Sequence, residues 1–451
     1  MDNKQYNRYD IHNHTRYSNL RLRDALPTPE DLINEAIKMG LKGINISDHE
    51  TLSGHIKANQ YAQKIKEKYP DFKVTLGNEI YLVDERPNND HYHFVLTCID
   101  AEGHRQLREL SSIAWLNNYT STLMRVDTLK EDLERIVLKN PGHLIGSTAC
   151  IGSELGKSIL AMTAAEKNND KMTAKFYHDK IVNFMLWGKK VFKDNFYIEV
   201  QPGISKEQII VNQRLLSISQ CFQVKMIPSS DSHYLRPEHR YVHKAFLNSD
   251  GNKEREVDAF YQDAYLHTNE EMIEKFKKSG YDELFIEQMF KNSMEVYNKI
   301  EDFSLGHSQQ VPKVPIPQIT KKEPPKSLIK YETLFKMYQS DDNIDRYWIN
   351  TCIDKLIETN KFNDTYLSEL EEEAEVKYIV GKRLNTNMFS YPIALAHYIK
   401  LIWDCDSTVG VGRGSACAAL NHYLLGITQL DPIEWNFPFF RYMNRDTEGL
   451  G

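Results

Sequence analysis

The chain has 451 residues, of which 41% are hydrophobic and 26% are charged, so it holds enough apolar material for a substantial globular core. This composition, the lack of an apolar run of about eighteen residues and the lack of a secretory signal exclude the membrane, collagen-like, coiled-coil and disordered classes. The net charge of -7 neither indicates nor excludes a nucleic-acid partner, and six widely spaced cysteines are typical of a reduced, cytoplasmic protein.

Roughly the first 300 residues alternate short apolar strands with amphipathic helices. Thr28 and Pro29 begin a helix that Gly40 ends, because a capping residue and proline favour the first turn and glycine favours the last. This alternation predicts an α/β fold with a mainly parallel sheet, either open or closed into a barrel. The predicted strands are 9–12, 41–46, 73–76, 93–97, 143–145, 196–200 and 224–227.

Metal-binding side chains follow or occupy nearly every predicted strand. Sites in parallel α/β folds form where the carboxyl ends of the strands converge. A single histidine there is more often a structural hydrogen-bonding group, but the repetition favours a metal site. Imidazole, carboxylate and thiolate together suit zinc, with manganese or iron as alternatives, and a carboxylate shared by two ions suits phosphate esters. The candidates are His12, His14, Asp24, His49, Glu79, His93, Cys150, Asp231 and His233.

A proline-rich segment, Val311 to Pro325, separates this block from a mainly helical second block. Apolar residues at helical spacing predict helices over 331–340, 345–359 and 366–381. The glycine-rich segment 410–416 then offers backbone N–H groups to an anion, with a helix expected from near Ser415. By itself such a segment is also compatible with a plain tight turn.

The motifs resemble the polymerase-and-histidinol-phosphatase (PHP) domain at the N-terminus of bacterial DNA polymerase III alpha subunits. The matching stretches include Asp10-Ile-His-Asn-His14, Ser47-Asp-His49, Tyr92-His-Phe94, Gly142 to Cys150, Phe196 to Gln201 and Ser230 to Leu235. The resemblance implies a distorted (β/α)7 barrel in which the nine candidates hold up to three Zn²⁺ or Mn²⁺ ions. It also selects His93 rather than His91 as the ligand, and Asp48 is expected to orient an imidazole.

The resemblance further implies a role for each ligand. Glu79 would bridge two ions, one completed by His12, His14 and Asp231 and the other by His93 and Cys150, while Asp24, His49 and His233 would hold a third. The expected activity is metal-dependent phosphoester hydrolysis, in the form of a 3′–5′ exonuclease. The residues expected to act in catalysis are His12, His14, Glu79, Asp231 and His233.

The second block resembles an incomplete polymerase palm, in which Arg413, Gly414 and Ser415 would bind nucleotide phosphate. The implied domains are a PHP domain with its helical extension (1–305), a linker (306–330) and a partial palm (331–451). The family's paired aspartates for Mg²⁺ follow the segment that matches 439–450, so this chain is not expected to polymerise DNA alone. The implied partners of the full enzyme in replication are primer–template DNA, dNTPs, the remaining C-terminal polymerase portion and other replisome subunits.

Two alternatives remain open from the sequence. One is a stand-alone PHP-family phosphatase of small molecules, which assays with histidinol phosphate and 3′-mismatched DNA would distinguish. The other is a non-catalytic scaffold in which the metal only stabilises the fold.

Overall fold

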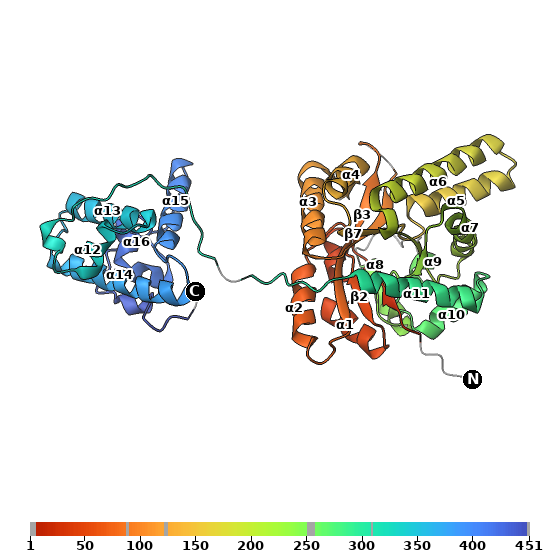
Figure 1. The fold of residues 1–451 in the computed structure, drawn as a ribbon, viewed down its shortest axis with the longest axis horizontal. Helices are drawn as coiled ribbons and strands as arrows, with labels where there is room; N and C mark the ends of the chain where they lie inside the picture. The colour runs from red at the N-terminus through yellow and green to blue at the C-terminus, as the bar shows by residue number, and fades with distance from the viewer. Residues whose placement is uncertain (1–5, 87–89, 121–124, 250–257, 308–309, 449–451) are drawn as a thin grey trace. The chain divides into compact units, whose positions relative to one another are not determined.

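The computed structural model describes residues 6–86, 90–120, 125–249, 258–307 and 310–448. The chain divides into two compact units, Met1–Gly306 and His307–Gly451 (Figure 1). Within the described ranges, no helix combines the length and the apolar character needed to cross a membrane.

The first unit is built around a sheet that curves into a nearly closed barrel. Seven strands follow one another in the order β1-β2-β3-β4-β7-β8-β9, and β6 pairs with both β3 and β5. A parallel bridge between Asn13 and Ser232 joins the segment after β1 to the segment after β9. This bridge brings the two ends of the sheet together. The strands are β1 (Tyr9–Asp10), β2 (Gly43–Ile46), β3 (Lys73–Val83), β4 (Tyr92–Cys98), β5 (Tyr119–Thr120), β6 (Arg125–Leu129), β7 (Leu144–Ser147), β8 (Phe196–Val200) and β9 (Met226–Pro228).

The predicted α/β class with a barrel-shaped sheet is confirmed, with two departures from a uniformly parallel arrangement. The short strand β5 runs antiparallel to β6. Strand β4 runs antiparallel to both of its neighbours, β3 and β7. This is possible because a short connection, rather than a crossover helix, links β3 to β4.

Helices cover the outside of the barrel. The first helix begins as predicted, since Thr28 and Asp31 form a reciprocal capping box around Pro29. Helix α11 packs against both β1 and β9, and α5 and α6 form a hairpin that extends from the barrel (Figure 1). The helices are α1 (Pro29–Lys38), α2 (His55–Ile65), α3 (Ala101–Asn117), α4 (Lys130–Lys139), α5 (Glu154–Lys167), α6 (Lys171–Phe192), α7 (Lys206–Phe222), α8 (Arg240–Leu247), α9 (Asp258–Tyr261), α10 (Asn269–Lys278) and α11 (Glu283–Lys299).

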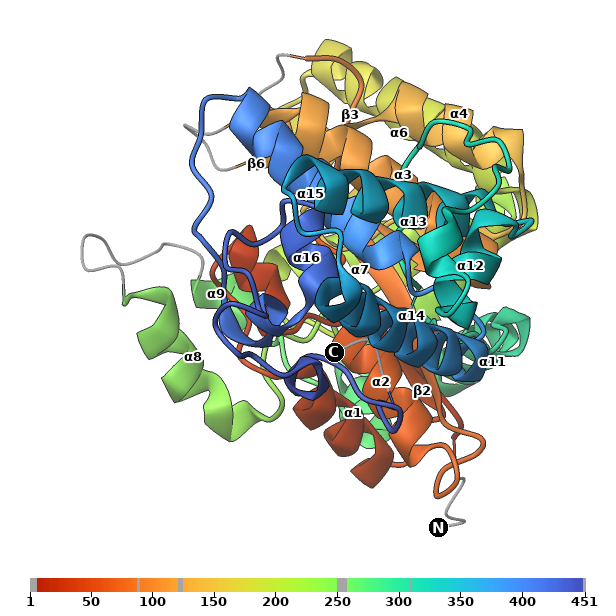
Figure 2. The same ribbon diagram turned by 90° about the vertical axis from the view of Figure 1, so that its left-hand side faces the viewer.

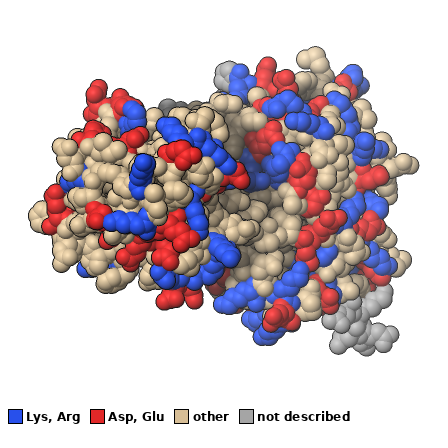
Figure 3. All heavy atoms as spheres, turned by 60° about the vertical axis from the view of Figure 1, so that its left-hand side comes forward, with Lys and Arg blue, Asp and Glu red and all other residues tan. Residues whose placement is uncertain are grey.

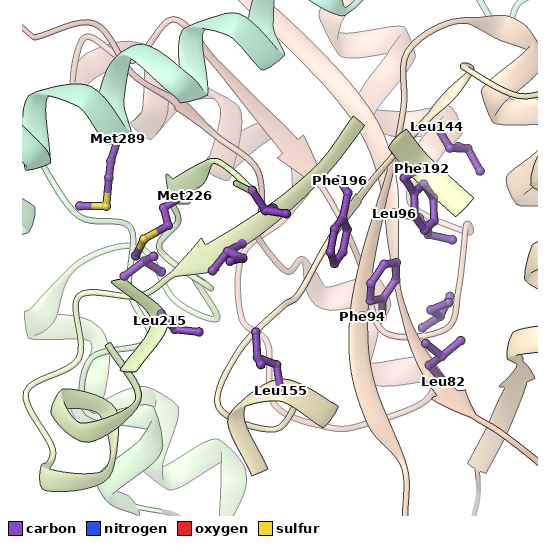
Figure 4. Close-up of a cluster of buried hydrophobic side chains, with 14 of the residues drawn as sticks. Leu82, Phe94, Leu96, Leu144, Leu155, Phe192, Phe196, Leu215, Met226 and Met289 are labelled. Carbon is purple, nitrogen blue, oxygen red and sulfur yellow. The ribbon is translucent and has the colours of Figure 1, made fainter. Parts of the chain in front are cut away.

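The main core of this unit lies between the sheet and its covering helices. Figure 4 shows Phe94 and Phe196 of the sheet beside Phe192 at the end of α6, with Leu155 of α5 and Leu215 of α7 nearby. All five side chains are buried, and burial of a side chain of this size stabilises the fold by about 1.5–3 kcal/mol. The strands are therefore held rigidly from the outside, which fixes the positions of their carboxyl ends.

The second unit is helical. Helices α12, α13, α14 and α16 pack together around the fully buried Trp348 (Figure 2). The proline-rich segment has neither helix nor strand over 310–325, and Val311 is buried in this unit; residues 308 and 309 of the predicted linker lie outside the described ranges. The helices are α12 (Glu332–Tyr338), α13 (Asn343–Glu358), α14 (Asp364–Leu384), α15 (Ser390–Asp404) and α16 (Leu420–Leu424).

The segment after the glycine-rich loop differs from the prediction of a helix beginning near Ser415. A 3₁₀ turn covers Gly414–Ala418, and α16 begins only at Leu420. Gly414 has a φ of +56° and Ala419 is extended, so the backbone cannot continue as one α-helix through this stretch.

Candidate metal centre

The barrel brings the predicted ligands together from seven parts of the chain. His12 and His14 follow β1, His49 follows β2, and Asp231 and His233 follow β9. Glu79 lies within the long strand β3, and its backbone forms a parallel bridge with His49. His93 lies on β4, Cys150 in the turn after β7, and Asp24 in the first loop.

One group of ligand atoms surrounds the Asp231 carboxylate. The Nε2 atoms of His12 and His14 lie 3.3 and 3.2 Å from Asp231 Oδ1 and 3.0 Å from each other. Three ligand atoms within 4.8 Å of one another can share one metal ion, and these three satisfy that distance.

A second group contains Glu79, His93 and Cys150. His93 Nδ1 lies 2.8 Å from Glu79 Oε1 and 3.3 Å from Cys150 Sγ. Glu79 also reaches the first group, because the same Oε1 atom lies 3.4 Å from His12 Nε2. A carboxylate in this position can connect two ions.

The third group surrounds Asp24. Its Oδ2 atom lies 3.1 Å from His49 Nε2 and 3.4 Å from His233 Nε2. The other nitrogen of His49, Nδ1, is 2.5 Å from Glu79 Oε2, so this group also adjoins the central glutamate. The structure thus brings all nine predicted residues into one cluster.

The arrangement of these atoms tests whether metal ions fit the cluster. Asp24 Oδ1, Asp231 Oδ1 and both carboxylate oxygens of Glu79 are buried without a hydrogen bond. The Asp231 and Glu79 oxygens lie close to imidazole nitrogens without forming hydrogen bonds, which is the geometry expected of ligands that face a common point. Buried charges without partners are costly, and divalent cations would remove that cost, so the residues fit metal ions.

Electrostatics lead to the same result. Burial disfavours the charged form of Glu79, but the imidazoles of His93, His49 and His12 outweigh it and hold its pKa well below the ordinary range. Burial, followed by the Asp231 and Glu79 charges, raises the pKa of the Cys150 thiol well above its ordinary value. A thiolate here therefore requires a nearby cation, and metal binding would release its proton.

Buried polar groups around the ligands fix their orientation. Glu199 of β8 accepts from the Nδ1 side of His12 at 2.7 Å, which leaves Nε2 free to face Asp231. Ser18 Oγ lies 3.1 Å from His14 Nδ1 and donates to Asp48 at 2.8 Å. Asp48 therefore acts on the His14 imidazole through Ser18. In the described structure, the hydrogen bonds of the Asp48 carboxylate come from Thr15 and Ser18 and not from a side chain of the cluster.

Two further residues hold Asp24 from outside the cluster. The Tyr261 hydroxyl donates to Asp24 Oδ2 at 2.8 Å, and His243 Nε2 lies 2.5 Å from the Asp24 carbonyl oxygen. Neither residue is near a recognisable motif, so sequence reasoning did not find them. Glu199 had a signal, namely a charged residue inside an otherwise apolar strand, but no role was predicted for it.

The remaining predicted positions are placed as follows. His91 Nδ1 lies 2.7 Å from Asp127 Oδ1 and takes no part in the cluster, whereas the His93 side chain is 24% exposed and gives the cluster access to solvent. In the second unit, Arg413, Gly414 and Ser415 are all exposed.

Two family profiles match the chain. The PHP domain matches residues 10–203, and the bacterial DNA polymerase III alpha NTPase domain matches residues 340–450. These matches fall in the first and second units, respectively.

Curated relatives match nearly the whole chain. "Probable DNA polymerase YorL" of Bacillus subtilis is 39% identical over 471 residues, which cover 97% of this chain and 35% of the relative. A DNA polymerase III subunit alpha of Borreliella burgdorferi is 28% identical, with 96% of this chain and 34% of the relative covered. The chain thus spans about a third of the length of these relatives.

Among solved structures, a "putative metal-dependent phosphoesterase" from Bifidobacterium adolescentis is similar with a TM-score of 0.30 and 17% identity, over 51% of this chain and 88% of that chain. The profiles and the relatives agree on both units and account for most of the sequence. The chain therefore resembles part of the DNA polymerase III alpha subunits over nearly its whole length, with a match to the PHP domain in its first unit and a match to the alpha NTPase domain in its second.

Proposed function

We propose that the first unit is a metal-dependent phosphodiesterase that removes nucleotides from the 3′ end of DNA. The observation that carries this proposal is the convergence of nine metal-binding side chains, eight of them buried, in which both Glu79 carboxylate oxygens and one oxygen each of Asp24 and Asp231 lack hydrogen bonds. The preferred ions are Zn²⁺ or Mn²⁺, up to three in number, because imidazole, thiolate and carboxylate ligands suit these metals.

In this proposal, Glu79 would help to hold two ions, because Oε1 lies 2.8 Å from His93 Nδ1 and Oε2 lies 3.7 Å from His14 Nε2. His12, His14 and Asp231 would hold one of these ions, His93 and Cys150 the other, and Asp24, His49 and His233 a third. Bound divalent ions would activate a water near neutral pH and neutralise the phosphoryl oxygens. Glu199 and Ser18 keep the imidazoles of His12 and His14 in position during this process.

An arginine beside the cluster supports a phosphate substrate. The Arg21 guanidinium lies 4.8 Å from the centre of the Tyr81 ring, and the same ring adjoins His49 and His93. The Nε atom of Arg21 is buried without a hydrogen-bond partner in the described structure. Lys, Arg, Asp and Glu side chains are interspersed on the part of the first unit's surface seen in Figure 3, which carries no broad basic patch.

For the second unit we propose that Arg413, Gly414 and Ser415 bind the phosphates of a nucleotide. The loop is exposed, and glycine favours its positive φ angles of +157° at Gly412 and +56° at Gly414. In the whole protein this unit would contribute to a Mg²⁺-dependent DNA polymerase that acts on primer–template DNA with other replisome subunits. We retain residues 1–305, 306–330 and 331–451 as the proposed PHP domain, linker and partial palm.

The proposal can be tested on 3′-mismatched DNA with Zn²⁺ or Mn²⁺ present. His49→Ala and Asp231→Ala should each abolish removal of the terminal nucleotide, whereas His178→Ala, which alters an exposed histidine of α6, should not. Activity of both cluster variants at the wild-type level would refute the proposal. Preferential hydrolysis of histidinol phosphate would favour a small-molecule phosphatase, and bound metal without hydrolysis of any phosphoester would favour a scaffold.

A further inference from the structure

A cavity of about 270 Å³ opens beside the metal cluster, with Asp231 in its wall. One side is formed by the segment after β8 and the start of α7, and the other by α9 and the residues that follow it. The cavity is smaller than the roughly 300 Å³ at which pockets for drug-sized ligands begin, so it suits one small group rather than a duplex. Its lining includes Ile151, Gln201, Pro202, Gln208, Phe260 and Ala264.

The charges around this cavity do not suit a phosphate. None of the described residues that line it is Lys, Arg or His, whereas Glu207, Asp231 and Asp263 are acidic. Asp263 is already satisfied, because Lys275 Nζ lies 2.6 Å from one carboxylate oxygen and the Ile204 N–H donates to the other. The cavity therefore suits an uncharged group with flat apolar faces and polar edges, next to a phosphate bound at the cluster.

Phe260 provides a stacking surface at the right place. Its ring is half-buried in the wall of the cavity, and its centre lies 6.5 Å from the centre of the His233 ring, at an angle of 80°. A group that stacks on Phe260 would therefore lie about one nucleotide from the ligands of the cluster. Aromatic side chains bind bases in this way whatever their sequence, because every base has a π-face.

We infer that this cavity receives the base of the 3′-terminal nucleotide, which stacks on Phe260 while its phosphate lies at the metal cluster. This inference rests on the proposed exonuclease function and names the part of the substrate that the site recognises. Phe260 is on this view a specificity-determining residue. It would contribute to substrate binding without taking part in hydrolysis.

Binding of a fluorescent nucleotide tests the inference without requiring catalysis. The 5′-phosphate of 2-aminopurine deoxyriboside is quenched when its base stacks on an aromatic ring, and we expect the Zn²⁺-loaded whole chain to quench it. Deoxyadenosine 5′-phosphate should displace this probe at about tenfold lower concentration than 2-deoxyribose 5-phosphate, which lacks a base. Equal competition by the two phosphates, or no quenching by the wild type, would overturn the inference.

Substitutions locate the effect. Phe260→Leu and Phe260→Ala should both lose quenching and reduce the tenfold preference to near unity; the leucine variant keeps the apolar packing that supports Tyr261. Phe176→Leu alters an exposed phenylalanine of α6 away from the cavity and should behave like the wild type. Quenching retained in Phe260→Leu would assign the stacking to another residue and contradict the inference.

The inference and the proposed function can fail separately. On DNA with a normal or an abasic 3′ end, the wild type should show a lower KM for the normal end, and Phe260→Leu should lose that difference without loss of kcat. Hydrolysis of both ends with equal KM would leave the exonuclease intact and remove the base pocket. Quenching through Phe260 without hydrolysis of any DNA would keep the pocket and refute the exonuclease.

Discussion

At the scale of single residues, Glu199 shows how a side chain outside the ligand set can control it. Its Oε1 atom accepts from the Nδ1 side of His12 at 2.7 Å and also from the Ser229 hydroxyl. Its Oε2 atom accepts from Ser147 at 2.9 Å. The ends of β7 and β9 therefore hold the Glu199 carboxylate through these two serines. In this position, Glu199 selects the His12 tautomer whose Nε2 lone pair can bind metal.

Glu199→Gln should weaken metal binding by about tenfold, because a neutral amide accepts less strongly and one of its two positions becomes a donor. Competition with a chromophoric chelator would measure the affinity of the whole chain for Zn²⁺. Glu295→Gln, at an exposed ion pair with Lys225, is the matched control. Unchanged affinity in Glu199→Gln would show that His12 does not depend on this contact.

Lys377 in α14 is fully buried, and its ammonium has no hydrogen-bond partner in the described structure. Burial lowers its pKa from 10.5 to about 8, so the unfolded chain binds the proton more tightly than the folded protein. The fold is therefore most stable, as far as this lysine is concerned, above pH 10.5, and that stability is lost as the pH falls through 8. Lys377→Met removes the buried ammonium but also the cation that faces the buried Glu373, so it should stabilise the second unit at pH 7 by only about 1 kcal/mol, with little effect near pH 10.5.

Hydrogen–deuterium exchange of the whole chain, followed in peptides from α14, would measure this change at both pH values. Lys382→Met alters an exposed lysine on the same helix and should have little effect at either pH. Faster exchange in Lys377→Met at pH 7 would show that the buried ammonium stabilises the unit instead.

At the scale of elements, the short helix α9 links two parts of the site. It presents Phe260 to the cavity beside Asp231, and the next residue, Tyr261, donates to Asp24 at 2.8 Å. One turn of helix therefore supports both a ligand of the third group and the wall of the cavity. A change in α9 should affect metal binding and substrate binding through adjacent residues.

Tyr261→Phe should weaken the Asp24 group selectively, because it removes a hydrogen bond to Oδ2 and leaves the packing of the ring. Elemental analysis after dialysis should find about one metal equivalent fewer than in the wild type. Tyr281→Phe removes a buried hydroxyl that donates to the Asn212 carbonyl, outside the cluster, and should retain the full complement. Equal metal content in all three proteins would contradict the role given to Tyr261.

The elements also show what sequence could predict. The apolar runs located seven strands of the barrel, and helical spacing located α12, α13 and α14 to within a few residues. The sequence pattern did not predict β6, because Asp127 and Thr128 interrupt the apolar pattern of that strand. It also did not predict the reversed direction of β4, because that direction depends on pairing between distant segments. The 3₁₀ turn at Gly414 was also missed, since backbone conformation there depends on local φ values.

At the scale of the whole molecule, motif spacing predicted the nine candidate ligands, and the structure brings them together. The residues that orient them could not be predicted in the same way. Glu199, His243 and Tyr261 act across the barrel or from later helices, so their roles follow only from three-dimensional packing. The ligand roles themselves remain predictions until metal is measured.

Removal of metal should destabilise the first unit and leave the second unchanged. An ion bound by the folded state alone stabilises it by mass action, and the ligands connect the start of the first unit with residues beyond β9. Calorimetry of the whole chain with and without EDTA should show a lower Tm for one transition only. A shift of both transitions, or of neither, would contradict the assignment of the metal to the first unit.

The contact between Asn13 and Ser232, where the two ends of the barrel sheet meet, has a consequence for synthesis of the protein on the ribosome. These residues are 219 positions apart, so a nascent chain has made most of the strands before the last one can join the first. Until then, both end strands expose unpaired backbone groups, which favour association with other chains. Translation pauses before residue 232 should therefore increase aggregation more than pauses after it.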